Sequence, residues 1–151
     1  MFKSSTWHRL LLNIYPPYFG SGIVIKSIDA DYHKLVVQLK MHWYNRNYMH
    51  TNFGGSLYAM TDPFYMLMLI QILGKDYIVW DKSAQIEFIK PGRGTLSADF
   101  ILSDNQIQDI KKNTSLGEKY LPEYLVEIKD ETGDLVASVR KVLYIRRKEK
   151  K

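Results

Sequence analysis

One segment of the sequence is apolar nearly all the way round a helix. Ser56 to Leu73 carries hydrophobic side chains on most faces, follows the pair Gly54-Gly55 and ends before Gly74. A helix of this kind must be covered on most of its circumference. Its most hydrophobic part, residues 63–73, spans eleven residues, whereas a bilayer requires about twenty. We therefore expect a buried central helix and no membrane span.

Other segments alternate between polar and apolar residues, which is typical of half-buried strands. The alternating or strand-like segments are residues 22–29, 33–41, 77–89, 95–102, 124–129 and 135–145. Glycine-containing turns at 90–94 and 130–134 lie between successive strands and predict a meander. A short surface helix is predicted over 104–112, with Asp104 as its cap and with Ile107 and Ile110 facing inward.

The N-terminal part of the chain predicts a short amphipathic helix. Trp7, Leu10, Leu11 and Ile14 are spaced i, i+3, i+4 and i+7, Thr6 or Ser5 is available as a cap, and Pro16-Pro17 follows. Within residues 1–17 we expect this helix to lie with its apolar side on the core. The complete order of elements predicts one α+β domain over residues 1–151, with an antiparallel sheet wrapped around one long helix. Long strands leave edges that a second copy can cover, so a homodimer is expected.

Charge and composition exclude several classes of protein. The absence of cysteine excludes disulfide frameworks and thiolate metal sites, and the four histidines lack the i, i+4 spacing of a helical metal site. The N-terminus lacks an apolar region long enough for a signal peptide, which favours a cytoplasmic location. The net charge of +5 falls to about +1 without residues 146–151. We expect that basic tail to be frayed and solvated; contact with nucleic acid or an anionic membrane is the alternative.

The loop before the central helix carries a recognisable pattern. Asn47-Tyr-Met-His50-Thr-Asn-Phe53-Gly54-Gly55 is followed by Asp62, seven residues after the second glycine. This spacing resembles that of the hot-dog-fold acyl-CoA thioesterases, particularly the phenylacetic-acid-degradation type and a related group of tetrameric thioesterase-like proteins. Residues 83–91 and 130–137 are similar to later strands of that family. Two positions depart from the pattern, because Phe53 replaces the family's histidine and His50 replaces its usual glycine.

The resemblance implies a hot-dog fold and hydrolysis of an acyl-CoA or related thioester, without a cofactor, in a homodimer or homotetramer whose active site crosses the dimer interface. Asp62 would be the base or nucleophile, the Gly55 N–H the oxyanion donor, and Asn47 the group that orients water or the substrate carbonyl. Structural alternatives exist for each. The glycines and Asn47 could serve only a turn. Apolar surroundings would strengthen Asp62 as a base, but Pro63 favours a second helical segment capped by Asp62.

Further candidates would contact the substrate. Phe53, Gly54, His50 and Tyr58 are candidate substrate contacts, and Tyr58 could line an acyl tunnel, although aromatic residues at helical spacing are common in plain cores. His50 could fold back and substitute for the family's histidine, or be a surface-loop histidine without a catalytic role. Lys90 and Arg93 could meet the phosphates of coenzyme A, or serve only as surface cations of a turn. Loss of the family's histidine favours a second function, binding of an acyl chain or thioester without turnover. A third function, an interaction or nucleic-acid module, would depend on the basic tail, and no nucleic-acid partner is expected.

Overall fold

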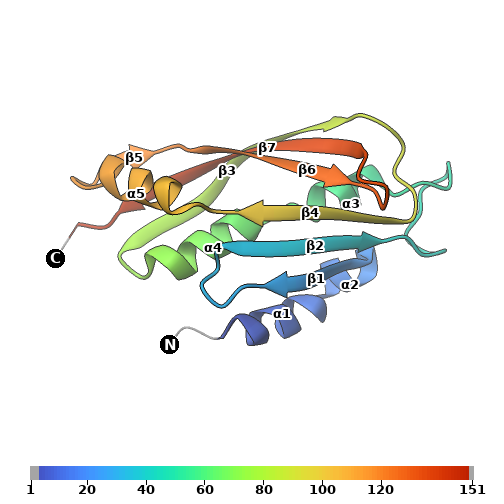
Figure 1. Ribbon diagram of the computed structural model, residues 1–151, viewed down its shortest axis with the longest axis horizontal. Coiled ribbons are helices and arrows are strands. Elements are labelled where there is room, and N and C mark those ends of the chain that lie inside the picture. Colours follow the sequence, from blue (N-terminus) through green and yellow to red (C-terminus); the bar gives the residue numbers. More distant parts are fainter. Residues whose placement is uncertain (1–3, 150–151) are drawn as a thin grey trace.

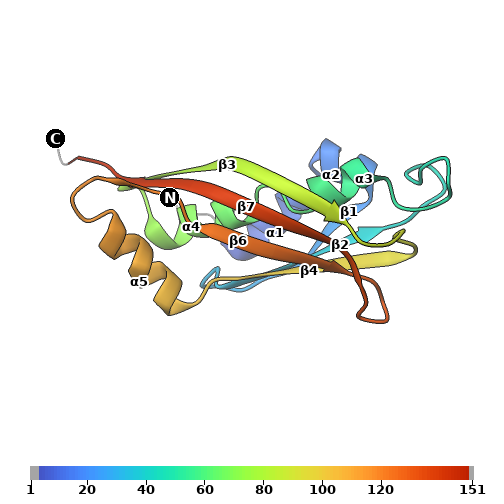
Figure 2. The same cartoon turned by 90° about the horizontal axis from the view of Figure 1, so that it is seen from above.

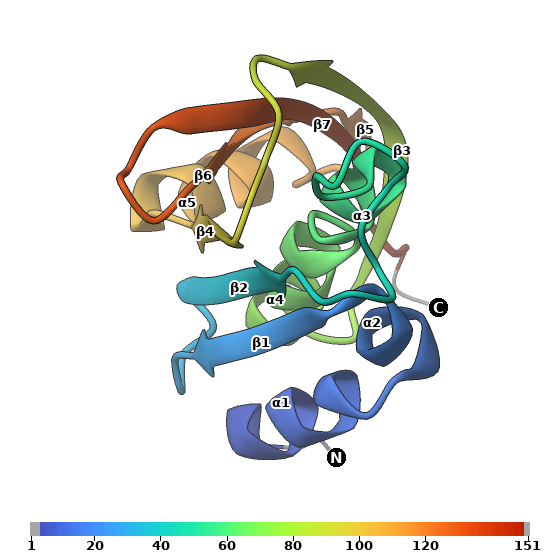
Figure 3. The same cartoon turned by 90° about the vertical axis from the view of Figure 1, so that its right-hand side faces the viewer.

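The computed structural model describes residues 4–149, which form a single curled sheet around two central helices (Figure 1, Figure 3). All strand pairs are antiparallel, in the order β1-β2-β4-β6-β7-β3, and β5 also pairs with β7. The strands are β1 Ile23–Ile28, β2 Lys34–Lys40, β3 Tyr77–Phe88, β4 Thr95–Ile101, β5 Lys119–Tyr120, β6 Glu123–Lys129 and β7 Leu135–Arg147. The predicted α+β class, with an antiparallel sheet wrapped around the central helix, is confirmed.

The central helix consists of two segments, α3 Gly54–Ala59 and α4 Phe64–Leu73. Its core positions, among them Met60, Phe64 and Met68, are completely buried. Pro63 interrupts the helix because its ring nitrogen carries no hydrogen to continue the hydrogen-bond ladder. The predicted buried central helix over residues 56–73 is therefore present, and it contains the second helical segment that Pro63 favoured, which begins at Phe64. Gly54–Leu73 is long and apolar enough to cross a membrane by composition, but it lies inside the curl of the sheet (Figure 3).

Strand β3 does not continue a meander into β4, as the turn at 90–94 had predicted. It pairs with β7 along nearly its whole length, from Tyr77 opposite Arg147 to Phe88 opposite Ala137, and forms one edge of the sheet (Figure 2). The connection that follows crosses to β4, which pairs with β2. The pairing with β7 brings β3 against α4 and closes the sheet further around the helix. The turn at 130–134 does form the predicted hairpin, between β6 and β7.

Helices α1 Ser5–Asn13 and α2 Pro16–Ser21 lie beside β1. The predicted apolar side of α1 does not lie on the core: Trp7, Leu10 and Ile14 are 57%, 50% and 72% exposed. The helix does lie over β1, but of its leucines only Leu12 is partly buried against the core among residues 4–149, and the contacts of Arg9 and Asn13 with β1 turn the predicted apolar stripe outward. The cap of α1 is Ser4, whose hydroxyl accepts from the Trp7 N–H, and not Thr6 or Ser5.

The C-terminal residues are ordered further than predicted. Arg146 and Arg147 belong to β7, since β3 and β5 both pair with the end of this strand. The Arg146 Nε donates to the Gly117 carbonyl at 2.8 Å, and the Lys148 Nζ donates to the Lys75 carbonyl at 2.6 Å. The predicted fraying of the basic tail was therefore wrong for residues 146–149, and residues 150–151 lie outside the described range.

Helix α5, Asp104–Asn113, buries Ile107 and Ile110 as predicted. Its cap is Ser103 instead of Asp104. The Ser103 hydroxyl accepts from the Gln106 N–H while the Gln106 side chain accepts from the Ser103 N–H. This reciprocal arrangement satisfies two helix-terminal donors, which Asp104 could not do from inside the first turn.

Candidate active site

A cavity of about 510 Å³ lies between the loop that precedes α3 and the connection that follows β3. Four of the residues predicted from sequence line it together, namely Asn47, Gly54, Lys90 and Arg93. The backbone joins the two segments directly, because the Asn52 N–H donates to the Gly92 carbonyl at 2.9 Å. Residues forty positions apart in the sequence therefore form one wall.

The side chain of Asn47 organises the loop. Its Oδ1 accepts from the backbone N–H groups of Met49 and Thr51 at 2.9 and 3.1 Å, and its Nδ2 donates to the Thr51 hydroxyl at 2.9 Å. An asparagine that bonds to the backbone two residues ahead is typical of a turn. These hydrogen bonds fit the turn role that the sequence left open for Asn47, and the residue also lines the cavity.

Gly54 and Gly55 open α3 after Phe53, whose carbonyl accepts from the N–H groups of Ser56 and Leu57. The N–H groups of the two glycines have no acceptor in residues 4–149, as expected for the start of a helix. Aromatic rings lie close to both glycines. A Cβ on Gly54 would come within 3.1 Å of the Phe88 ring, and one on Gly55 would collide with the Phe53 ring. The residue that replaces the family's histidine therefore lies against the proposed oxyanion donor.

The two cations on the cavity wall differ in their partners. The Lys90 Nζ lies 2.7 Å from an Asp130 oxygen and 2.8 Å from an Asp134 oxygen, and these hydrogen bonds raise the pKa of Lys90. The same contact with Lys90 holds the pKa of Asp130 well below its usual value. Arg93 instead donates from Nη1 to the backbone carbonyl of His50 at 3.2 Å. The positive charge of Lys90 is therefore compensated by two carboxylates, whereas among residues 4–149 Arg93 is bonded to a backbone carbonyl and has further N–H donors for another acceptor.

His50 and Tyr58 stand outside the cavity wall. His50 is exposed and has a positive φ of 56° at the turn of the loop. Tyr58 lies on α3 with 40% of its surface exposed. Neither side chain reaches the other predicted site residues through a hydrogen bond in the part of the chain that the structure describes.

Asp62 belongs to a second cluster, at the break between α3 and α4. Its side chain is 48% exposed, and its Oδ1 accepts from the Lys141 Nζ at 2.8 Å. Lys141 is only 1% exposed and also lies 3.0 Å from the Asp81 Oδ1. The Tyr18 hydroxyl donates to the Asp62 backbone carbonyl. The predicted apolar surroundings of Asp62 were thus wrong, and so was the capping alternative, because α4 begins after Pro63 without any side-chain cap.

The electrostatics of this cluster follow from two carboxylates around one ammonium. Burial lowers the pKa of Lys141, but the hydrogen bonds with Asp62 and Asp81 outweigh it, so that this pKa is raised overall. Burial also raises the pKa of Asp81, against the opposing effect of Lys141. The Asp81 Oδ2 is buried without a hydrogen-bond partner among residues 4–149. Lys141 is therefore the group that compensates the buried charge of Asp81, while Asp62 remains open to solvent.

Lys141, Asp81 and Tyr18 were not identified from the sequence, although one signal was present. Lys141 stands between Val139 and Leu143 in the alternation of β7, at a position that faces the core. Lysine is almost never fully buried unless it is paired. An inward-facing lysine in a strand therefore predicts a buried carboxylate partner, but not which one.

Asp62 is not on the wall of the cavity that contains Asn47 and Gly54. Of the predicted residues, Asn47, Gly54, Lys90 and Arg93 thus line the cavity and Asp62 belongs to the second cluster, while His50, Phe53, Gly55 and Tyr58 are in neither place. Within residues 4–149 no group of three or more His, Cys, Asp or Glu side chains is arranged to hold a metal ion.

Residues 5–145 match the model of a protein family described as a domain of unknown function, DUF4442. This chain belongs to the DUF4442 family. No functionally curated protein matches it. Solved structures do match the DUF4442 chain. A Pseudomonas aeruginosa protein described as a probable thioesterase has a TM-score of 0.83 at 15% identity, covering 97% of this chain and 98% of its own.

Two further structures carry more specific names. The Escherichia coli PaaI protein of the phenylacetic acid degradation operon matches with a TM-score of 0.60 and 18% identity, over 97% of each chain. Thioesterase superfamily member 2 of Mus musculus matches with a TM-score of 0.65 and 16% identity, over 95% of this chain and 98% of its own. These identities show the fold alone, and the DUF4442 protein has the hot-dog fold that its sequence resemblance had implied.

Proposed function

We propose that this protein hydrolyses acyl thioesters and that coenzyme A thioesters are its substrate class. The observation that carries the proposal is the solvent-accessible carboxylate of Asp62, held at a break in the central helix by the buried Lys141. The shared fold of proteins named as thioesterases supports the same reaction class. A carboxylate fixed by an ion pair at the surface of a buried helix is available to a substrate without any rearrangement of the core.

Asp62 would take a proton from water, and the hydroxide so formed would attack the carbonyl carbon of the thioester. The carbonyl oxygen becomes an oxyanion, for which the Gly55 N–H without an acceptor is the proposed donor. Collapse of this intermediate breaks the carbon–sulfur bond, and the proton that Asp62 took from water passes to the leaving thiolate, which departs as the free thiol and leaves Asp62 ionised again. In the alternative mechanism, the Asp62 carboxylate itself attacks the carbonyl carbon of the thioester and forms a mixed anhydride, which water then hydrolyses. Neither form requires a cofactor.

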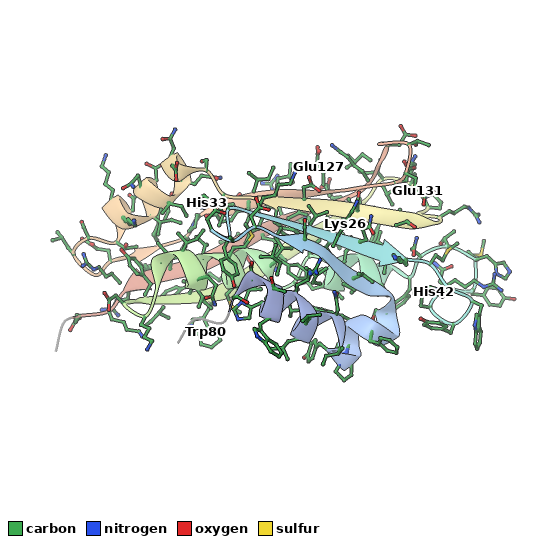
Figure 4. All side chains as sticks on the ribbon, turned by 60° about the horizontal axis from the view of Figure 1, so that its bottom comes forward. Lys26, His33, His42, Trp80, Glu127 and Glu131 are labelled. Carbon is green, nitrogen blue, oxygen red and sulfur yellow. The ribbon has the colours of Figure 1, made fainter. Side chains whose placement is uncertain are left out.

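The proposed site is completed by a second copy of the chain, since Asp62 is absent from the wall of the cavity that contains Gly54. Strand β3 lies at the end of the sheet order, and within residues 4–149 it pairs only with β7, so its outer edge is open to pairing there. Trp80, on this strand, is 63% exposed (Figure 4). We propose a homodimer in which Asp62 of one copy serves the cavity of the other, and a homotetramer is a further assembly that the resemblance allows.

Arg93 is the proposed contact for the phosphates of coenzyme A, because Lys90 is already paired with two carboxylates. Phe53 and Tyr58 are the proposed contacts for the acyl group. Asn47 would act by holding the loop, through its bonds to Met49 and Thr51, rather than by touching the substrate.

Binding without turnover is the second candidate function, and one observation favours it. Phe53 stands where the resemblance places a histidine, and its ring occupies the space that a Cβ on Gly55 would take. A chain without that histidine could bind a thioester without hydrolysing it.

A panel of short, long and aromatic acyl-CoA thioesters distinguishes the two functions. We expect release of free thiol from at least one class, measured by its reaction with a chromogenic disulfide. Saturable binding by calorimetry without thiol release would support the binding function instead. The absence of both would contradict a thioester site.

Heterodimers test whether the site is shared between copies. An Asp62→Asn chain and a Gly54→Val chain are co-expressed with different affinity tags, and the heterodimer is purified by using both tags in turn. The Gly54→Val substitution should damage the cavity, because the valine side chain would crowd the Phe88 ring. In a shared site, one of the two sites in each heterodimer keeps both native residues, and we expect about half the wild-type activity per dimer. The two homodimeric variants are the controls. A heterodimer no more active than these controls would place the site within one chain.

A further inference from the structure

The loop between β2 and α3 exposes a group of aromatic side chains at one end of the sheet. We name residues 42–50 the aromatic loop, and it extends beyond the end of β2 (Figure 1, Figure 4). Trp43 and Tyr48 are 81% and 96% exposed. The Tyr44 ring is stacked on the His42 ring with 5.2 Å between centroids, and the Trp43 ring stands edge-on to Tyr44. Exposed aromatic clusters of this kind mark binding sites on protein surfaces.

Two asparagines fix the backbone of the aromatic loop. The Asn45 Oδ1 accepts from the His42 N–H at 2.7 Å, and its Nδ2 donates to the Lys40 carbonyl at 2.9 Å. Asn47 holds the second half of the loop through its bonds to two backbone N–H groups. The exposed rings are therefore carried by an ordered backbone, so that a ligand meets a surface that is already formed.

The aromatic loop is continuous with the wall of the cavity. Met49 belongs to both. Arg93, from the opposite segment of the wall, donates to a backbone carbonyl of the loop at 3.2 Å. Arg46 forms a β-bridge with Asn52, whose N–H donates to the Gly92 carbonyl. The two arginines thus belong to segments that are bonded to each other beside the cavity, and both side chains are exposed.

The charge of the aromatic loop suits an anionic ligand. Residues 32–61 contain three Lys or Arg and no Asp or Glu. One carboxylate comes near from another part of the chain, because Glu131 lies within 3.5 Å of the position of a Cβ on Gly94. Among residues 4–149, however, neither Arg46 nor Arg93 forms an ion pair. Both guanidinium groups therefore have N–H donors for a ligand.

We propose that the aromatic loop binds the nucleotide end of coenzyme A, with the adenine base against the rings of Trp43 and Tyr48 and the phosphates at Arg46 and Arg93. Every nucleobase has a flat face that stacks on an aromatic ring, and a guanidinium group offers paired donors to phosphate oxygens. A nucleotide joins these two features in one molecule. The inference rests on the proposed function, because the cavity beside the loop would hold the thioester end of the same substrate.

Coenzyme A without an acyl group is the probe, and calorimetry measures its binding. The double variant Trp43→Ala/Tyr48→Ala should bind coenzyme A at least about tenfold more weakly, because two stacking surfaces are lost. Both side chains are exposed, so the fold should be retained, which circular dichroism checks. Trp7→Ala is the matched control, since Trp7 is also an exposed tryptophan but lies on α1. It should bind coenzyme A like the unchanged protein.

An acyl thioester of pantetheine, which lacks the nucleotide, separates this inference from the proposed function. The unchanged protein should hydrolyse it with a lower kcat/KM than the matching coenzyme A thioester, because remote binding energy is lost. The double variant should lower kcat/KM for the coenzyme A thioester toward the pantetheine value. If neither thioester were hydrolysed, the proposed hydrolase function would fail, while coenzyme A binding that depends on Trp43 and Tyr48 would still support the nucleotide site.

Three results would overturn the nucleotide site even if thioesters were hydrolysed. They are no binding of coenzyme A, equal binding by the unchanged protein and the double variant, and equal kcat/KM for the two thioesters. Light scattering supplies a fourth comparison: a lower molecular mass for the double variant alone would assign the aromatic loop to contact between copies and would also overturn the proposal.

Discussion

Replacing Lys141 with methionine is expected to lower the free energy of unfolding by about 3 kcal/mol, because removing one partner of a buried ion pair leaves the other uncompensated. Lys141 is 1% exposed and lies 3.0 Å from Asp81, whose carboxylate is mostly buried. Asp62, being half exposed, adds little to this loss, since water screens its charge. Urea denaturation of the two proteins at neutral pH measures the difference.

Two comparisons identify the cause. Asp81→Asn, added to Lys141→Met, should recover a large part of the lost stability, because it removes the buried charge. Lys129→Met is the matched control: Lys129 pairs with Glu127 on β6, but both side chains are nearly half exposed, so a change below about 1 kcal/mol is expected. Equal losses for the two lysine variants, or no recovery with Asp81→Asn, would contradict the role given to Lys141.

The same ion pairs predict a dependence on pH. The carboxylates raise the pKa of Lys141 above its ordinary value of 10.5. A group whose pKa is higher in the folded state stabilises the fold below its unfolded pKa, and this contribution disappears as pH rises through the folded value. The difference in stability between the unchanged protein and Lys141→Met should therefore be constant near neutral pH and shrink above about 10.5.

Asp62→Asn is expected to reduce thioester turnover by about a hundredfold or more, the effect of a lost general base. Asparagine keeps the size of the side chain and an oxygen that can accept from Lys141, so the fold should be retained. Turnover is measured under saturating substrate, which separates loss of chemistry from loss of binding. Thermal unfolding of the same preparations shows whether the variant is intact.

Asp99→Asn is the control for this substitution. Asp99 is 49% exposed and pairs with Lys34 at 3.3 Å, so it matches Asp62 in exposure and in having a lysine partner, but lies on β4. Its variant should keep normal turnover. If Asp62→Asn left thioester turnover unchanged, another group would have to be catalytic. Asp81, the other carboxylate that pairs with Lys141, would be the next candidate.

The strands and the central helix were predictable because their signals are local. Alternation identified β2, where Leu35, Val37 and Leu39 are all completely buried. The pairing of β3 with β7 was not predictable in the same way, since no local pattern in a strand names its neighbour. The predicted orientation of α1 was wrong for a related reason. Its apolar stripe was read correctly, but its orientation depends on Asn13 bonding to Ile25 in a strand that comes later in the chain.

The predictions for the candidate site show the same difference between local patterns and contacts that are distant in the sequence. The register from Asn47 to Asp62 could be read from the sequence, and the structure gathers the first part of that motif around one cavity. What each side chain does there depends on partners far along the chain. Lys90 is neutralised by Asp130 and Asp134, and Asp62 is paired with Lys141, 79 residues later. Such contacts follow from the topology of the sheet, which the local pattern does not contain.

The amide of Asn13 has a consequence for growth of the sheet beyond one molecule. It occupies both outward backbone groups of Ile25 on β1, so that this border cannot accept a strand from another chain at its centre. The opposite border, β3, has no such cover among residues 4–149. If two molecules pair through β3, each molecule no longer has an open sheet edge among residues 4–149. The joint sheet then ends at the β1 edge of each molecule, where Asn13 occupies the backbone groups of Ile25. The arrangement permits a closed pair while preventing strand-by-strand polymerisation into fibres.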